Sequence, residues 1–200
     1  MNRITPGGAV RRALPVLAAI VLLAAALSAC GGGGDTSATA ATAADKEADA
    51  AVLNEILARQ EGVARAYAVS FPALHDRRNL AAARLFRAQE QEHIDATLKA
   101  LRGLGAEPEA EPEVISAAGL DTEVEFLTFL YELENATIEA EMTAIAKLTE
   151  PAPRTMLAAT IANQAQHLAA IRRALGAGPL RATPSAFENG TVPVPTVAAR

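Results

Sequence analysis

The sequence predicts an all-α protein: a four-helix bundle in which two helical hairpins are joined by one long crossover. Half of the 200 residues are hydrophobic, alanine is abundant, and only 4% are aromatic. Alanine is the residue most easily placed in a helix, so this composition favours closely packed helices over a β sandwich or a nucleotide-binding α/β domain. Four segments carry apolar residues at helical spacing, and the loops between them are short, long and short.

The helical segments begin and end at residues that suit helix termini. We expect helices over residues 49–70, 77–104, 121–148 and 153–175. Pro72 follows the first, Asp76 suits the cap of the second and Gly105 its end. Pro153 suits the first turn of the fourth, which ends before Gly176.

The loop lengths predict the topology. Short loops at residues 71–75 and 149–152 make antiparallel neighbours of the helices that they join. Residues 105–120 form a longer, acidic link that contains Pro108 and Pro112. A chain of this length can extend about 50 Å, which exceeds the roughly 40 Å length of such helices. The long link can therefore cross the whole bundle between the two hairpins.

The first 29 residues are typical of a lipoprotein signal peptide. Arg3, Arg11 and Arg12 precede an uncharged apolar run of 16 residues, which is short for a membrane span of about 20. The run ends in Leu27-Ser28-Ala29-Cys30, which resembles a lipobox, and Cys30 is the only cysteine. Cleavage would leave lipidated Cys30 as an anchor in the cell membrane, with the protein facing outside the cytoplasm. The alternative is an uncleaved anchor helix with an incidental cysteine.

The mature chain then divides into three parts. We expect a flexible tether over residues 30–45, the bundle over 46–177, and a Pro-rich extended tail over 178–200, without a fifth helix. Loss of the signal removes three positive charges and takes the net charge from −5 to −8. This negative net charge argues against nucleic acid as a partner and against electrostatic binding to anionic lipid.

Polar residues interrupt all four apolar stripes near the middle of each helix. They are Glu61 in the first, Glu90 and His93 in the second, Glu134 in the third, and Gln164 and His167 in the fourth. Residues three apart share one helical face, so His93 lies on the same face as Glu90, and His167 on the same face as Gln164. Glu61 precedes Glu90 by 29 residues and Glu134 precedes Gln164 by 30, so antiparallel packing brings them level in each hairpin. Carboxylate oxygen and imidazole nitrogen together suit iron and manganese.

Residues from about 50 to 175 resemble the ferritin-like superfamily, which includes rubrerythrin-like and bacterial ferritin-like lipoprotein domains. The segments 89–93 and 163–167 resemble the Glu-x-x-His motifs of helices two and four, and 59–61 and 132–135 resemble the single-glutamate sites. The resemblance implies iron or manganese held by the six polar residues named above. It also implies ferrous oxidation, peroxide reduction or metal handling, and it admits a homodimer. It does not identify a catalytic residue.

Gln164 departs from this pattern, because the family holds a bridging glutamate at that position. A carboxamide has no charge and one good acceptor oxygen, so the site could hold two metals less tightly, one, or none. Glu141 is two turns, about 10 Å, from Glu134, which makes it a poor substitute. The alternative function is a non-catalytic lipoprotein bundle that binds a partner or supports the envelope, with these residues as a metal-free hydrogen-bonded network.

Overall fold

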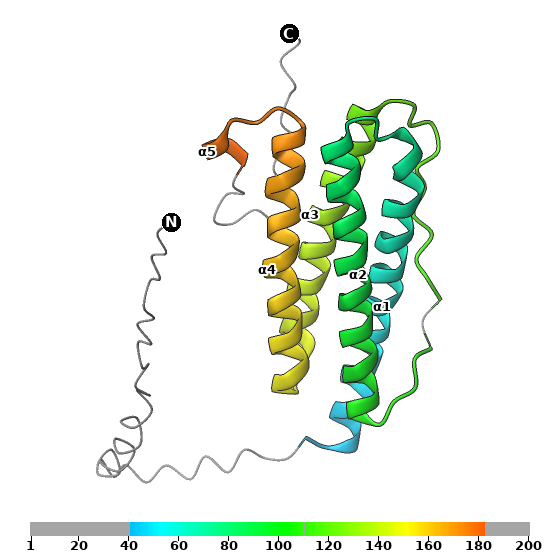
Figure 1. Ribbon diagram of the computed structural model, residues 1–200. Helices are drawn as coiled ribbons and strands as arrows, with labels where there is room; N and C mark the ends of the chain where they lie inside the picture. The colour runs from blue at the N-terminus through cyan, green and yellow to red at the C-terminus, as the bar shows by residue number, and fades with distance from the viewer. Residues whose placement is uncertain (1–40, 110, 183–200) are drawn as a thin grey trace, which may run out of the picture. The chain divides into compact units, whose positions relative to one another are not determined.

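The computed structural model describes residues 41–109 and 111–182 of the chain. Within these ranges four long helices lie side by side: α1 (Ala43–Ser70), α2 (Arg77–Leu104), α3 (Glu123–Lys147) and α4 (Pro151–Ala174) (Figure 1). A 3-10 turn, η1 (Phe71–Ala73), follows α1. The predicted all-α bundle of two hairpins is confirmed. The predicted signal peptide, Cys30 and the region from residue 183 onward lie outside the described residues.

Local capping explains where the helices begin. Thr42 and Asp45 form a reciprocal capping box, in which the Asp45 amide donates to Thr42 Oγ1 at 3.1 Å and the Thr42 amide donates to Asp45 Oδ2 at 2.9 Å. Helix α1 therefore begins at Ala43, six residues before its expected start at 49. Asp76 caps α2 as predicted, accepting from the amides of Arg78 and Asn79.

The beginning of the tail differs from the expected extended chain. Residues Pro179–Ala182 form one helical turn, α5. The Ala182 amide donates to the Gly178 carbonyl at 2.9 Å, and Ala182 is buried. Pro179 at the first helical position has a backbone angle already suited to a helix and lacks an N–H that would need a partner. One turn of helix is thus compatible with the proline that predicted an extended tail.

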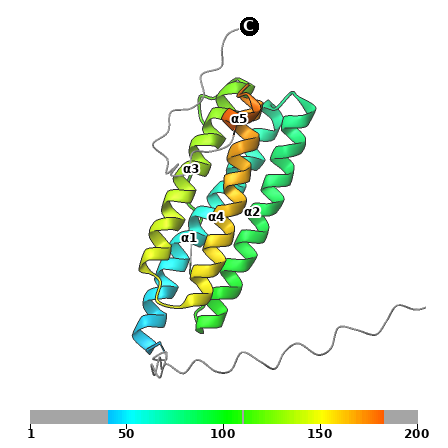
Figure 2. The ribbon, with the colours of Figure 1, turned by 90° about the vertical axis from the view of Figure 1, so that its left-hand side faces the viewer.

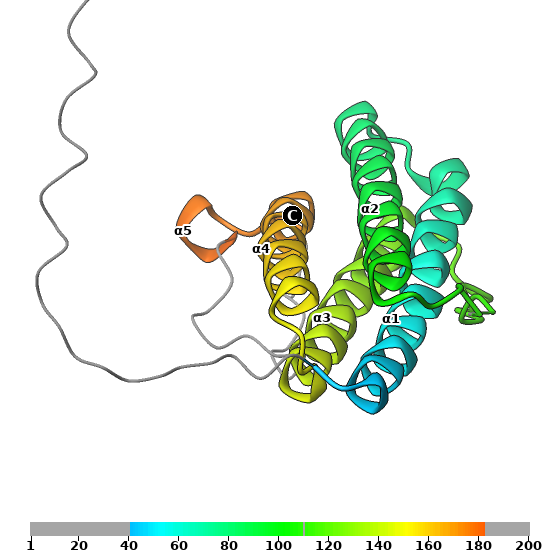
Figure 3. The ribbon, with the colours of Figure 1, turned by 90° about the horizontal axis from the view of Figure 1, so that it is seen from below.

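The helices pack as two hairpins, α1 with α2 and α3 with α4, and α1 also contacts α3 while α2 contacts α4 (Figures 2 and 3). The crossover from α2 to α3 runs along the outer side of α1 (Figures 1 and 3). Its Glu113 amide donates to the Ala58 carbonyl at 2.8 Å, and its carboxylate pairs with Arg59 at 2.8 Å. The predicted long link therefore spans the bundle and is fixed to α1.

Each hairpin also fixes the turn of the other. Asp49 of α1 is fully buried and accepts from the amides of Thr149 and Glu150, both at 2.8 Å, at the start of α4. Glu123 of α3 accepts from the amides of His75 and Asp76, at 3.0 and 3.1 Å, at the start of α2. A carboxylate is favourable at a helix N-terminus, where amides lack partners. These contacts fix the register between the hairpins.

The core has two apolar clusters. One surrounds Tyr67, Phe86 and Leu130, and the other surrounds Leu53, Leu57 and Leu157. Fully buried polar side chains near the middle of the helices, among them Glu90, Glu134 and Gln164, lie between these clusters. Among the described residues, no helix is both long enough and apolar enough to cross a membrane.

Candidate metal centre

All four long helices contribute to a polar layer between the apolar clusters. Each side chain in this layer is at most 1% exposed to solvent. The layer includes Gln60, Glu90, Glu134, Glu141, Gln164 and His167. Burying an ionised carboxylate without a partner is strongly unfavourable, so such a layer needs hydrogen bonds, protons or a cation. The contacts of these side chains show which of them have hydrogen-bond partners and which could hold a proton or a cation.

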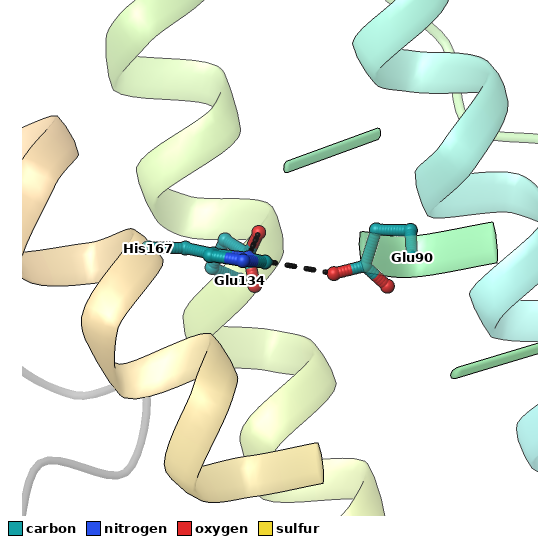
Figure 4. Close-up of side chains that lie close together, drawn as sticks. All are labelled: Glu90, Glu134 and His167. Carbon is teal, nitrogen blue, oxygen red and sulfur yellow. Dashed lines mark hydrogen bonds and ion pairs between the residues drawn. The ribbon is translucent and has the colours of Figure 1, made fainter. Parts of the chain in front are cut away.

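Glu90, Glu134 and His167 form the tightest group in the layer. One ligand atom from each lies within 4.8 Å of the other two. His167 Nδ1 is 2.9 Å from Glu134 Oε1 and 3.5 Å from Glu90 Oε1. Figure 4 shows Glu90 pointing from α2 toward Glu134 of α3 and His167 of α4. The group therefore joins the two hairpins.

The contacts of His167 fix which ring nitrogen faces the carboxylates. Its Nε2 lies 2.9 Å from Gln89 Oε1, an oxygen that can only accept, so Nε2 carries a hydrogen. Phe86 stacks on the ring at a centroid distance of 4.1 Å. In the neutral ring, Nδ1 then has a lone pair directed at the acceptor oxygen of Glu134. A proton or a metal ion has to lie between these two atoms.

The burial and charges of Glu90 and Glu134 also require a proton or a metal ion at this place. Burial, reinforced by the charge of Glu134, raises the pKa of Glu90 well above its usual value, against the opposite effect of His167. Glu90 Oε1 and Glu134 Oε2 are both buried without a hydrogen-bond partner. Unpartnered buried acceptors are rare in folded proteins and call for an explanation. Two carboxylates and an imidazole with free acceptor positions fit an iron or manganese ion.

Tyr67 of α1 adds a donor to this group. Its hydroxyl, fully buried, donates a short hydrogen bond to Glu134 Oε1. Burial and the nearby charge of Glu134 raise the pKa of Tyr67 well above its usual value, so the hydroxyl keeps its proton. Tyr67 therefore orients the Glu134 carboxylate. The Tyr67 ring also packs edge-on against Phe86.

A second set of contacts crosses all four helices. Thr97 donates to Gln60 Oε1 at 2.9 Å, and Gln60 Nε2 donates to Glu141 Oε1 at 3.1 Å. Gln164 Nε2 lies 3.5 Å from the same oxygen. Burial raises the pKa of Glu141 to about 8, with the charge of Glu90 adding to the rise and the Gln60 hydrogen bond opposing it.

His93 stands beside Glu90, three residues further along α2. Its Nδ1 is 3.3 Å from Glu90 Oε2, and 11% of its side chain is exposed. Burial lowers the pKa of His93, while the charges of Glu141 and Glu134 oppose that shift. A neutral imidazole is the form that binds a metal.

The structure brings five of the six sequence-selected residues to the polar layer or its edge, and it places the sixth elsewhere. Glu90, Glu134 and His167 converge, Gln164 is buried beside Glu141, and His93 contacts Glu90. Glu61 is only half-buried and does not belong to the group. The α1 position in the layer is held by Gln60. On α1, therefore, the residue facing the centre is a carboxamide, because the helix turns the adjacent glutamate outward.

Comparisons with known proteins agree with the fold. The family model described as a ferritin-like domain matches residues 36–177. A ferritin-like, diiron-carboxylate protein from Bacillus anthracis strain Ames has a similar structure (TM-score 0.58, 20% identity, covering 66% of this chain and 98% of that one). So does a conserved hypothetical protein from Mycobacterium tuberculosis (TM-score 0.59, 18% identity, covering 68% and 95%). No curated protein sequence matches the chain.

Proposed function

The chain belongs to the ferritin-like domain family, and on that premise we propose that it binds iron or manganese through Glu90, Glu134 and His167. The observation that carries the proposal is the facing pair of His167 Nδ1 and Glu134 Oε1, 2.9 Å apart in a buried site. An ion between them would use both lone pairs and the free oxygen of Glu90. A bound iron or manganese ion would supply one-electron redox chemistry at this place.

Side chains next to the proposed ligands would hold them in position. Gln89 holds the His167 ring so that Nδ1 faces inward, and Tyr67 orients the Glu134 carboxylate. Hydrogen-bonded neighbours of this kind orient metal ligands in metalloproteins. Phe86 covers the His167 ring and excludes water from that side. The proton that the raised pKa of Glu90 keeps on its carboxyl would leave when the ion enters, so binding should weaken as the pH falls.

Metal analysis of the purified full chain tests this proposal. After anaerobic loading with ferrous or manganous ion and removal of the excess, we expect bound metal in the unsubstituted chain and its loss in Glu134→Gln and in His167→Ala. His75→Ala is the matched control, because this exposed histidine lies in the α1–α2 turn and should leave the metal content unchanged. A wild-type chain that stays metal-free under these conditions would rule the proposal out.

One observation favours the alternative of a non-catalytic bundle with a metal-free polar layer. Gln60 and Gln164 both direct their amide groups at Glu141, as in a hydrogen-bonded network that needs no ion. That network leaves Glu90 Oε1 and Glu134 Oε2 without partners, which is why we favour the metal site. The same metal analysis separates the two functions.

We also propose that Cys30 anchors the protein in a membrane, facing outside the cytoplasm. The support is the sequence: positive residues, a short apolar run, small residues and a single cysteine in the expected order. Cys30→Ser should prevent lipidation and leave an unprocessed precursor, seen by mass spectrometry, whereas Ser37→Ala in the expected tether should be processed normally. A mature chain beginning at another residue, without acyl groups, would contradict this assignment.

A further inference from the structure

A groove on the surface of the bundle lies outside the proposed metal site. It runs between α1 and α3, which lie side by side (Figures 2 and 3), and its volume is about 390 Å³. Its floor is apolar, with Val52 and Ile56 from α1 and Ala140 and Ala144 from α3. Covering apolar surface of this kind with another molecule removes it from water and is favourable.

Five charged side chains line the groove, and two of them are paired with each other. Arg59 Nη1 donates to Glu113 Oε2 at 2.8 Å. The other three, Glu55, Glu139 and Lys147, are exposed, and within residues 41–109 and 111–182 they form no ion pair. An apolar centre with a charged rim is the usual composition of a surface that contacts another protein.

The contacts between α1 and α3 fix which of their positions are level. The two helices run antiparallel, and Gln60 Nε2 of α1 donates to Glu141 Oε1 of α3 at 3.1 Å. Leu57 lies three residues before Gln60, and Thr143 lies two residues after Glu141. Because the helices run in opposite directions, Leu57 and Thr143 are level to within about one helical turn.

We propose that this groove is the contact surface between two copies of the chain, packed antiparallel about a twofold axis that passes at the level of Leu57 and Thr143. Glu139 and Lys147 lie four residues on either side of Thr143. The axis therefore brings Glu139 of each copy to Lys147 of the other, so the contact occurs twice. The surface uses no residue of the proposed metal site, and this inference does not depend on the proposed function.

The charges of α1 fit the same axis. Glu55 and Arg59 lie two residues on either side of Leu57, so each faces its counterpart on the second copy. Glu113 uses only Nη1 of Arg59, and a guanidinium has five N–H donors, which leaves donors for Glu55 of the second copy. Charge pairs at the rim of an interface fix its orientation more than its affinity, which the apolar floor supplies.

Charge reversal at the α3 contact tests the axis. Native mass spectrometry of the full chain in detergent micelles, over a range of concentrations, measures the fraction of dimer. Glu139→Lys and Lys147→Glu should each raise the dissociation constant of the dimer at least about tenfold, because each places like charges against each other at two contacts. Glu92→Lys reverses an exposed glutamate of α2, outside the groove, and should dimerise like the wild type.

A mixture of the two reversed variants gives a readout that misfolding cannot produce. In a heterodimer of Glu139→Lys with Lys147→Glu, both contacts again join opposite charges. With one variant labelled with nitrogen-15, we expect heterodimers at close to the wild-type dissociation constant and few homodimers. A monomeric wild type, single variants that dimerise like the wild type, or a mixture without excess heterodimer would overturn the inference. Dimers that form only after removal of residues 183–200 would assign the groove to that segment and overturn it too.

Discussion

At Glu141, burial conflicts with the charge that a carboxylate carries in the metal-free protein. It is fully buried, it lies under the influence of two other carboxylates, and its hydrogen-bond donors are neutral carboxamides. Two neutral donors at one oxygen offset only part of the penalty for burying a charge. The side chain therefore retains its proton to higher pH than an exposed glutamate does.

This conflict predicts how the stability of the metal-free chain depends on pH. Folding raises the pKa of Glu141 from 4.5 to about 8. Between these values the folded state binds more protons than the unfolded state, so the free energy of unfolding falls as the pH rises and levels off above the folded pKa. Glu141→Gln should remove this contribution, which is on the order of a few kcal/mol because one pKa unit corresponds to about 1.4 kcal/mol.

Denaturant unfolding from pH 5 to 9 with a chelator present measures this dependence. We expect Glu141→Gln to gain stability relative to the wild type as the pH rises, with a smaller remaining slope from Glu90, whose pKa moves in the same direction. Glu139→Gln should keep the wild-type slope, because Glu139 is exposed. Identical slopes in the wild type and Glu141→Gln would show that Glu141 is not held as the buried acid described above.

The sequence predicted that polar residues meet near the middle of the four helices, but it did not identify all of these residues correctly. The residue pairs Glu90–His93 and Gln164–His167 share helical faces, and their register follows from loop lengths. On α1, Gln60 and Glu61 lie on either side of the stripe's centre, and one residue turns a helix by 100°, so spacing alone did not separate them. Glu141 was discounted because backbone rise measures the distance between helix positions and not where carboxylate oxygens reach.

At the scale of elements, a glycine in α1 allows the crossover to pack closely against this helix. Gly62 is buried within α1, and a Cβ there would lie 2.8 Å from the Glu113 carbonyl oxygen and 2.9 Å from Ile115 Cδ1. Backbone at this separation cannot move away without breaking its hydrogen bond to Ala58. The absence of a side chain therefore allows the crossover to lie against the helix.

Gly62→Ala is accordingly expected to destabilise the protein in spite of alanine's higher helix propensity. The overlap should cost about 1–3 kcal/mol, the usual penalty for forcing extra atoms into packed structure. Gly103→Ala is the matched control, since Gly103 is also helical and nothing lies near its added Cβ, so we expect it to stabilise by up to about 1 kcal/mol. Thermal unfolding of both variants measures the difference. Equal stabilisation by the two substitutions would contradict the close approach of the crossover.

The sequence located the helices well but not all of their ends. Asp76 and Gly105 act at the ends of α2 as predicted, because an N-terminal aspartate and a glycine at positive φ are strong local signals. The start of α1 was placed late, since Thr42 and Asp45 lie in an alanine-rich stretch without an apolar stripe. The caps that Asp49 and Glu123 provide to the opposite hairpin could not be predicted, because they depend on how the hairpins pack.

At the scale of the whole molecule, the polar layer is the place where a bound ion would join the two hairpins. Glu90 comes from the first hairpin, and Glu134 and His167 come from the second. In the apolar clusters, packing holds the hairpins together, whereas in the layer Glu90 Oε1 and Glu134 Oε2 lack hydrogen-bond partners. An ion at this place would give these oxygens a partner and would link the two hairpins.

Metal binding should therefore stabilise the entire bundle. The ligands converge only in the folded chain, so manganous ion at 100 times its dissociation constant should raise the free energy of unfolding by about 2.7 kcal/mol. Glu134→Gln should abolish this gain, because it removes a ligand of the ion, while His75→Ala should preserve it. Thermal unfolding with and without manganous ion measures these gains. An equal rise in Glu134→Gln and the wild type would place the stabilising ion outside the polar layer.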